Sequence, residues 1–367
     1  MNSRKAHPLN LRAGDLVEVR SEQEILAMLD QHGAIDGMPF MPEMLEFCGK
    51  RFRVEKRADK TCNTITAMES RRLYDTVHLE GLRCTGQSHG GCQAQCFLFW
   101  KEAWLKRVKE GDANSRPSPS IIEPVPAPSS SSGCNRARLN ELTLRPDAPN
   151  GSEIFYRCQA TDLLKASEPL PWWDVRQYAR DVLSGNVGVT DLIKAALFRV
   201  FLKSLKVGIA YRAQIWAYNR LQAWRCGTPY PFRHGQLDKT PRETLNLQPG
   251  DLVQVKSYDE ILKTLNKRNR NKGLFFGSEM VPYCSSVRRV RARVERIIHE
   301  PSGKMMTLPG ECLILEGAIC GSRYSERRLF CPRSLYPFWR EIWLKRVEET
   351  GAPRVRPGSP AIRDVPE

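Results

Sequence analysis

The stretch LRAGDLVEVRSEQEILAMLDQHG, residues 11–33, returns later in the chain as LQPGDLVQVKSYDEILKTLNKRN, residues 247–269. A second stretch, FWKEAWLKRV at 99–108, returns as FWREIWLKRV at 338–347. The offset is 236 residues at the first stretch (14 to 250) and 239 at the second (100 to 339). This period is too long for a solenoid, whose units bury their apolar faces only against neighbouring units. We therefore predict a duplicated domain in which each copy has its own core.

Within each copy, the residue pattern predicts short strands around one small helix. GDLVEV and GDLVQV alternate apolar and polar residues and contain β-branched valine, which is typical of a strand. Ser21 and Ser257 follow, each with a glutamate three residues later, and this capping box predicts the start of a helix. The pattern favours a mainly β fold with some α, arranged as a small barrel.

The opening of each copy resembles a known fold. Its Gly-Asp-hydrophobic-x-hydrophobic pattern, at Gly14 and Gly250, resembles the first strand of the SH3-like barrels found in translation and transcription factors. The repeat as a whole resembles an uncharacterised bacterial tandem-repeat family, and that resemblance implies no chemistry. We expect duplicated small SH3-like β-barrel domains joined by a helical middle segment.

Composition divides the chain into five segments. They are a first repeat at 9–110, a Pro- and Ser-rich linker at 111–150, a basic amphipathic helical segment at 151–240, a second repeat at 245–348 and a disordered tail at 349–367. The helical pattern of the middle segment contains Gly208, where we expect a bend. Trp172 and Trp173, which follow Pro-Leu-Pro, are predicted to form a buried anchor.

Composition also bounds the class of protein. Of the 367 residues, 41% are hydrophobic and 27% charged, which is typical of a globular chain rather than a disordered one. No apolar run fits a signal peptide or a membrane-spanning helix, so we expect a cytoplasmic protein, with attachment to the inner face of the membrane as a further possibility. In that reducing compartment, the twelve cysteines would stay as thiols or bind metal.

Three cysteine positions recur in the two copies, and a fourth cysteine aligns one residue away from a histidine. Zinc in structural sites takes four Cys or His ligands, so the recurrence predicts one zinc ion per copy, two per chain. The predicted ligands are Cys48, Cys62, Cys84 and Cys92 in the first copy, and Cys284, His299, Cys320 and Cys331 in the second.

Other roles for these cysteines stay open. They could be small buried hydrophobic residues or disulfides. Cys48, Cys84 and Cys92 could also hold a catalytic zinc with water in the fourth position. Cys96 and Cys312 have no cysteine partner in the other copy, and we expect them to be packing residues.

The net charge of +16 is unevenly distributed. Residues 192–237 contain eight Lys or Arg and no acid, and residues 248–347 contain 19 basic and 10 acidic residues. A surface with an excess of positive charge attracts anions. We therefore predict nucleic acid, acidic protein or an anionic membrane surface as the partner. The predicted anion-binding residues are Arg289, Arg291 and Arg293 of one strand and Lys194, Arg199, Lys203 and Lys206 of the middle helix.

Motifs of common enzyme classes are missing from the sequence. GQSHGG at 86–91 lacks the Lys and Ser or Thr of a phosphate-binding loop, and neither GxSxG nor HExxH occurs. We assign no catalytic residue. The sequence favours a non-enzymatic binding or adaptor protein with an anionic partner, nucleic acid first. The alternatives are a peripheral membrane protein, attached through the basic amphipathic helix, and a zinc-dependent hydrolase or transferase.

Overall fold

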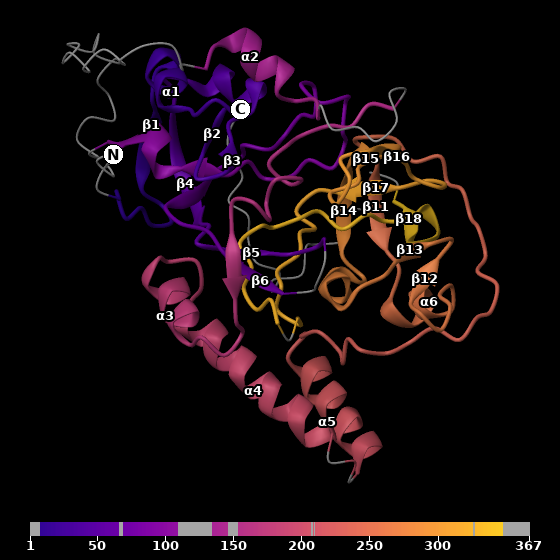
Figure 1. Ribbon diagram of the computed structural model, residues 1–367. Coiled ribbons are helices and arrows are strands. Elements are labelled where there is room, and N and C mark those ends of the chain that lie inside the picture. The colour runs from indigo at the N-terminus through magenta and orange to yellow at the C-terminus, as the bar shows by residue number, and fades with distance from the viewer. Residues whose placement is uncertain are drawn as a thin grey trace. The chain divides into compact units, whose positions relative to one another are not determined.

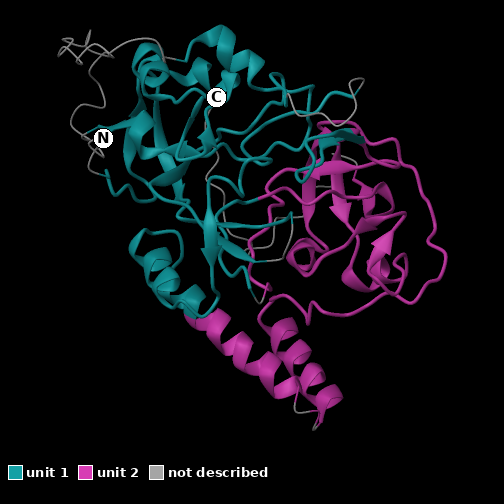
Figure 2. Cartoon of the chain, in the orientation of Figure 1, with its two compact units in different colours: residues 1–192, 296–306, 326–334 teal, residues 193–295, 307–325, 335–367 magenta. Residues whose placement is uncertain are grey.

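The computed structural model describes residues 8–65, 69–108, 134–145, 153–206, 208, 210–325 and 327–347 (Figure 1). The chain divides into two compact units (Figure 2). Unit 1 comprises residues 1–192, 296–306 and 326–334, and unit 2 comprises residues 193–295, 307–325 and 335–367. The units therefore differ from the predicted segments, because two pieces of the second repeat belong to unit 1. The predicted tail lies outside the described residues.

The main sheet of unit 1 is antiparallel and carries the core of the first repeat. Its strand order is β8 (Trp100–Lys101), β7 (Thr76–Leu79), β4 (Arg51–Arg57), β1 (Leu16–Val19) and β9 (Leu105–Arg107). Trp100 of β8 and Trp104 are fully buried, and each ring lies edge-to-face with Phe40, with ring centroids 6.1 and 5.1 Å apart. Edge-to-face aromatic pairs add to the stabilisation from apolar burial.

Smaller elements complete unit 1. A second sheet has the order β10 (Glu168–Leu170), β6 (Ser70–Arg72) and β5 (Lys60–Cys62). The helices are α1 (Glu22–Met28), η1 (Pro42–Phe47), η2 (Glu102–Trp104), α2 (Arg136–Glu141) and α3 (Arg176–Leu183). Two hairpins are β2 (Ala34–Ile35) with β3 (Met38–Pro39), and β15 (Arg296–Ile298) with β16 (Met305–Thr307), the last residue of which is assigned to unit 2.

Unit 2 repeats this plan. Its sheet has the order β17 (Leu313–Leu315), β14 (Val287–Arg293), β11 (Leu252–Val255) and β18 (Leu344–Arg346). Other elements are α6 (Tyr258–Leu262), η4 (Ser278–Tyr283), η5 (Glu341–Trp343) and the hairpin of β12 (Arg270–Asn271) with β13 (Leu274–Phe275). Two longer helices precede them, namely α4 (Val189–Lys206), which begins in unit 1, and α5 (Tyr211–Trp224).

The two repeats agree in strand register. Leu16 pairs with Arg53 and Leu252 pairs with Arg289, and both β4 and β14 carry a bulge at the matching place. Both predicted capping boxes, at Ser21 and Ser257, are present. The fold is mixed, with small antiparallel sheets and some helices. In the described part of the chain the sheets stay open and none closes into a barrel.

Three local expectations differ from the structure. The bend expected at Gly208 is a full reversal into a hairpin of α4 and α5, since the Gly208 φ of +79° ends helical continuation (Figure 1). The predicted linker contains α2, which starts at the side-chain cap of Asn135. Trp172 and Trp173 are exposed rather than buried.

Candidate metal centre in unit 1

A hairpin between residues 84 and 96 brings several metal-binding residue types together. Arg83 and Phe97 form a β-bridge, and the backbone N–H of Cys84 donates to the carbonyl oxygen of Cys96 at 2.8 Å. Cys84 and Cys96 therefore lie opposite each other. Directly opposite residues point to the same face, with Cβ atoms about 4.5–5.5 Å apart.

Gly86 forms the turn in the loop of this hairpin. The N–H groups of His89 and Gly91 both donate to the Gly86 carbonyl oxygen, at 3.1 and 2.8 Å. Gly86 has a φ of +74°, and a Cβ there would lie only 2.0 Å from the carbonyl oxygen of Cys92. Only glycine fits such a close backbone approach. This approach draws Cys92 back toward the base of the hairpin.

Glu43, Cys84 and His89 form a compact donor cluster. Each offers one ligand atom, and these atoms lie within 4.8 Å of one another. The Sγ of Cys84 is 3.3 Å from Nε2 of His89, and Nδ1 of His89 is 3.8 Å from a carboxylate oxygen of Glu43. This cluster could hold a metal ion, and it is the only such group in the part of the chain that the structure describes. Three protein ligands would leave one position of a tetrahedral ion open, as in catalytic zinc sites.

A cavity of about 40 Å³ adjoins the cluster. This is several times the space of about 10–15 Å³ that one water molecule needs by the same kind of measure. Its wall combines His89 with aromatic rings and four thiols, namely Cys84, Cys92, Cys96 and Cys158. A cavity with so many sulfur atoms has the donor chemistry that soft metal ions prefer.

Burial holds the donor groups of the cavity in their neutral forms. Burial, helped by the carboxylate of Glu43, raises the pKa of Cys84 well above its usual value, and burial lowers the pKa of His89. Burial also raises the pKa of Cys96 to about 12 and that of Cys158 to about 11. A metal ion that binds here must therefore displace thiol protons, which makes its affinity depend on pH.

One ion pair lies in the cavity wall. The guanidinium of Arg333, which is 1% exposed, donates to Glu300 at 2.6 Å and to the carbonyl oxygen of Cys62 at 3.4 Å. Within the described part of the chain, the Nε atom of Arg333 has no hydrogen-bond partner. The wall thus places a buried cation beside the thiols.

The predicted zinc ligands do not form the two predicted groups among the described residues. In unit 1, Cys62 contacts the thiol of Cys331, and this hydrogen bond lowers the pKa of Cys62. Cys92 accepts the backbone N–H of Ile298 at 3.3 Å, and Cys48 is half-buried at the C-terminal end of η1. The second set is divided, with Cys284 and Cys320 in unit 2 and His299 and Cys331 in unit 1.

Cys62 and His299 do not hold equivalent positions relative to their strands. Strand β5 ends at Cys62 and strand β15 ends at Ile298, which is the residue 236 positions later. Side chains on a strand alternate between its faces, so His299, one residue on, does not occupy the place of Cys62. Glu43 and His89 were not among the predicted ligands. The spacing Cys-x4-His-x2-Cys-x3-Cys from Cys84 to Cys96 was the available signal for His89.

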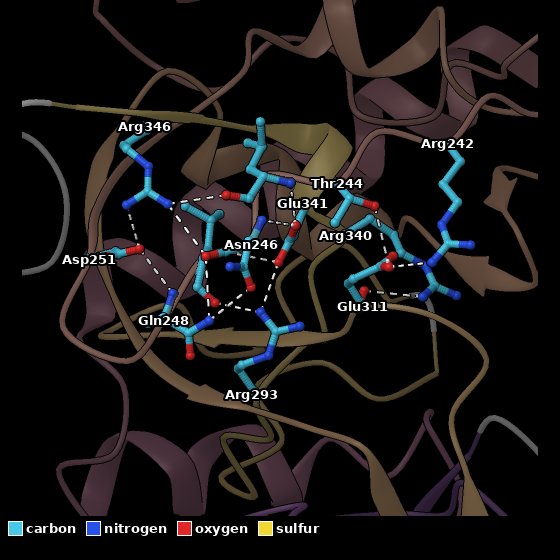
Figure 3. Close-up of polar contacts among 12 residues, drawn as sticks. Arg242, Thr244, Asn246, Gln248, Asp251, Arg293, Glu311, Arg340, Glu341 and Arg346 are labelled. Atoms are coloured by element: carbon cyan, nitrogen blue, oxygen red, sulfur yellow. Dashed lines mark hydrogen bonds and ion pairs between the residues drawn. The ribbon is translucent and has the colours of Figure 1, made fainter.

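Several predicted anion-binding arginines make contacts inside their own unit. Arg293 lies 2.9 Å from Glu341, and Arg289 donates to the carbonyl oxygen of Gly250 (Figure 3 shows Arg293 and Glu341). Arg291 lies over the ring of Tyr336, and Arg199 donates to the carbonyl oxygen of Ser325. The remaining predicted residues, Lys194, Lys203 and Lys206, are exposed on α4.

Comparisons with known proteins add no assignment. No protein-family model, curated protein or solved structure matches this chain. Among the described helices, none combines the length and the apolar character needed to cross a bilayer. Function is therefore inferred from the geometry of the described residues.

Proposed function

We propose that this chain is a non-enzymatic binding protein that docks on an anionic membrane surface through the α4–α5 hairpin, while a zinc ion stabilises unit 1. The observation that carries the proposal is a set of exposed apolar side chains on this hairpin. Ile193, Leu197 and Val200 follow the helical spacing of one face of α4. Leu197 is 65% exposed and Val200 is 66% exposed.

One face of each helix packs against the other helix through aromatic rings, and the outer face is exposed. Phe201 stacks on Tyr218 of α5 with ring centroids 4.7 Å apart, and Phe198 packs on the same ring at 5.8 Å. These contacts fix the two helices against each other and turn the apolar residues of the outer face to solvent. Trp224, at the end of α5, is 81% exposed. Tryptophan is enriched where proteins meet the membrane interface.

The positive charge of the hairpin favours an anionic partner. Lys203, Arg212 and Arg220 are exposed on the hairpin, within the stretch 192–237 that contains no acid. Basic residues beside exposed apolar ones fit an anionic bilayer, which takes apolar side chains below its charged headgroups. Protein surfaces that bind nucleic acid are more polar, so the exposed aliphatic row favours the membrane.

Three finer assignments belong to the same proposal. We assign zinc because thiol and imidazole ligands suit it. We assign each repeat as an SH3-like module, supported by the shared strand order and by the Gly-Asp turn before β1 and β11. We assign the cytoplasmic face of the membrane, since all twelve cysteines are free thiols.

Vesicle flotation tests the docking. We expect the purified protein to float with vesicles that contain phosphatidylserine and phosphatidylcholine, and not with vesicles of phosphatidylcholine alone. The double variant Leu197→Glu/Val200→Glu should lose flotation, because two charges on the outer face oppose insertion. Val175→Glu is the matched control, since Val175 is a 71% exposed apolar residue outside the hairpin.

Two results would overturn the membrane proposal. One is equal flotation of the hairpin variant and the wild type. The other is no flotation at all, together with binding to DNA or RNA whose affinity falls steeply with salt, which would favour the nucleic-acid partner. Elemental analysis of protein purified without chelator tests the zinc separately.

A further inference from the structure

We propose that Cys84, His89, Cys92 and Cys96 form a closed three-sulfur, one-nitrogen zinc site, in which Glu43 orients His89 without binding the ion. The inference deepens the proposed zinc site and rests on it. It changes the chemistry of the site. A Glu-Cys-His site would be open to water, whereas a closed Cys3His site is structural.

The orientation of His89 is the first support. Its Nε2 faces the Sγ of Cys84 at 3.3 Å, whereas its Nδ1 faces the hydroxyl of Ser88 at 3.1 Å. That hydroxyl donates to Glu43 at 2.5 Å, and the Glu43 carboxylate lies 3.8 Å from Nδ1. A histidine that binds metal through one nitrogen commonly holds its other N–H against a carboxylate or a polar group. Glu43 and Ser88 occupy this outer position.

The placement of the sulfur atoms is the second support. Cys96 lies opposite Cys84 in the hairpin, and the Gly86 turn draws Cys92 toward both. All three thiols line the same cavity as His89. Neither Cys92 nor Cys96 has its Sγ within 4.8 Å of both Cys84 Sγ and a ring nitrogen of His89. Zinc binding would therefore require both side chains to change their χ1 rotamer, of which a cysteine has three. Zinc binding would select these rotamers, about 2.3 Å from the ion.

Charge in the cavity wall is the third support. Zinc with three thiolates and a neutral imidazole carries one net negative charge. The buried guanidinium of Arg333 lines the cavity and is paired through its Nη atoms with Glu300, while its Nε atom has no hydrogen-bond partner among the described residues. A guanidinium at low dielectric attracts such an anionic centre.

Zinc binding by single variants of the full-length protein tests the ligand set. We expect Cys92→Ser and Cys96→Ser to lose zinc in competition with a chromogenic chelator. Glu43→Gln should keep the zinc with an affinity about 10- to 100-fold weaker, because it alters only the outer hydrogen bond. Cys158→Ser should bind as the wild type does. It is the matched control, because Cys158 lines the same cavity from another segment.

A measurement on the wild type keeps the test independent of variant folding. X-ray absorption at the zinc edge should report three sulfur neighbours and one nitrogen. A single sulfur neighbour, or loss of zinc in Glu43→Gln with retention in Cys96→Ser, would overturn the inference and leave a three-donor Glu-Cys-His site. Absence of zinc from the wild type would instead reject the proposed zinc itself.

Discussion

In unit 2 the guanidinium of Arg293 lies 2.9 Å from the buried carboxylate of Glu341, and unit 1 contains the same pair as Arg57 and Glu102 at 2.7 Å. The Glu341 carboxylate also accepts three backbone N–H groups (Figure 3), which are those of Leu245, Asn246 and Leu247. In each repeat, one buried glutamate, in η2 of unit 1 or η5 of unit 2, thus binds the segment that leads into the first strand. Arg293 compensates this charge.

Replacing Glu341 should destabilise unit 2 strongly. Glu341→Ala leaves the partly buried Arg293 and three backbone N–H groups without their acceptor, and breaking a buried pair costs about 3–5 kcal/mol. Urea unfolding should show this loss. Lys345→Ala is the control, because its exposed pair with Glu260 contributes about 0.2–1 kcal/mol. Equal losses in the two variants would contradict the assigned role of Glu341.

Acid should weaken unit 1 through His78. Burial lowers the pKa of His78 from 6.5 to about 3, while the unfolded chain keeps the ordinary value. The unfolded state therefore binds the proton first. The contribution of His78 to stability is complete above pH 6.5 and is lost as the pH falls toward about 3, by at most about 1.4 kcal/mol per pH unit.

The second repeat suggests the variant for this test. Ile314 holds the register position of His78, since Lys56 pairs with His78 and Ala292 pairs with Ile314. His78→Ile should therefore flatten the fall in unfolding free energy between pH 6.5 and 4, as measured by urea denaturation at several pH values. Parallel curves for the two proteins would assign the acid sensitivity to other groups.

Two glycines with the same φ distinguish two costs of adding a side chain, namely backbone strain and steric clash. Gly81 and Gly86 both have a φ of +74°, but a Cβ at Gly81 meets nothing within 4 Å. Gly81→Ala should cost about 1–2 kcal/mol, the usual penalty for a left-handed residue with a side chain. Gly86→Ala should cost clearly more and should also lower zinc retention, because its Cβ collides with Cys92. Similar costs and unchanged zinc retention would show that the loop can relax.

Local signals in the sequence were sufficient for part of the fold. The Gly-Asp turns, the alternating strands and the capping boxes at Ser21 and Ser257 depend on residues within a few positions of each other, and the structure contains them. The duplication itself could be recognised from the sequence because both copies lie in one chain. The hairpin at Gly208 was only half predicted, since a bend and a full reversal share the same glycine signal.

The candidate site was harder to predict because its contacts are distant in sequence. Glu43 reaches His89 from η1, and Cys62 meets Cys331 across most of the chain. Matching cysteines between the copies assumed that both copies keep the same site. The structure instead assigns β15 and the segment around Cys331 to unit 1, so the recurring cysteines have different surroundings.

A buried ion pair between β5 and α3 gives a final test of how unit 1 is held together. Lys60 lies 2.5 Å from Asp181, and its ammonium also donates to the carbonyl oxygen of Leu329 at 2.7 Å. Lys60→Met leaves a buried, unpaired carboxylate and should cost about 3–5 kcal/mol. The double variant Lys60→Met/Asp181→Leu removes both charges, so it should unfold at a higher urea concentration than Lys60→Met alone. If the second substitution instead lowers stability further, as two independent losses would, the pair is not coupled as the structure indicates.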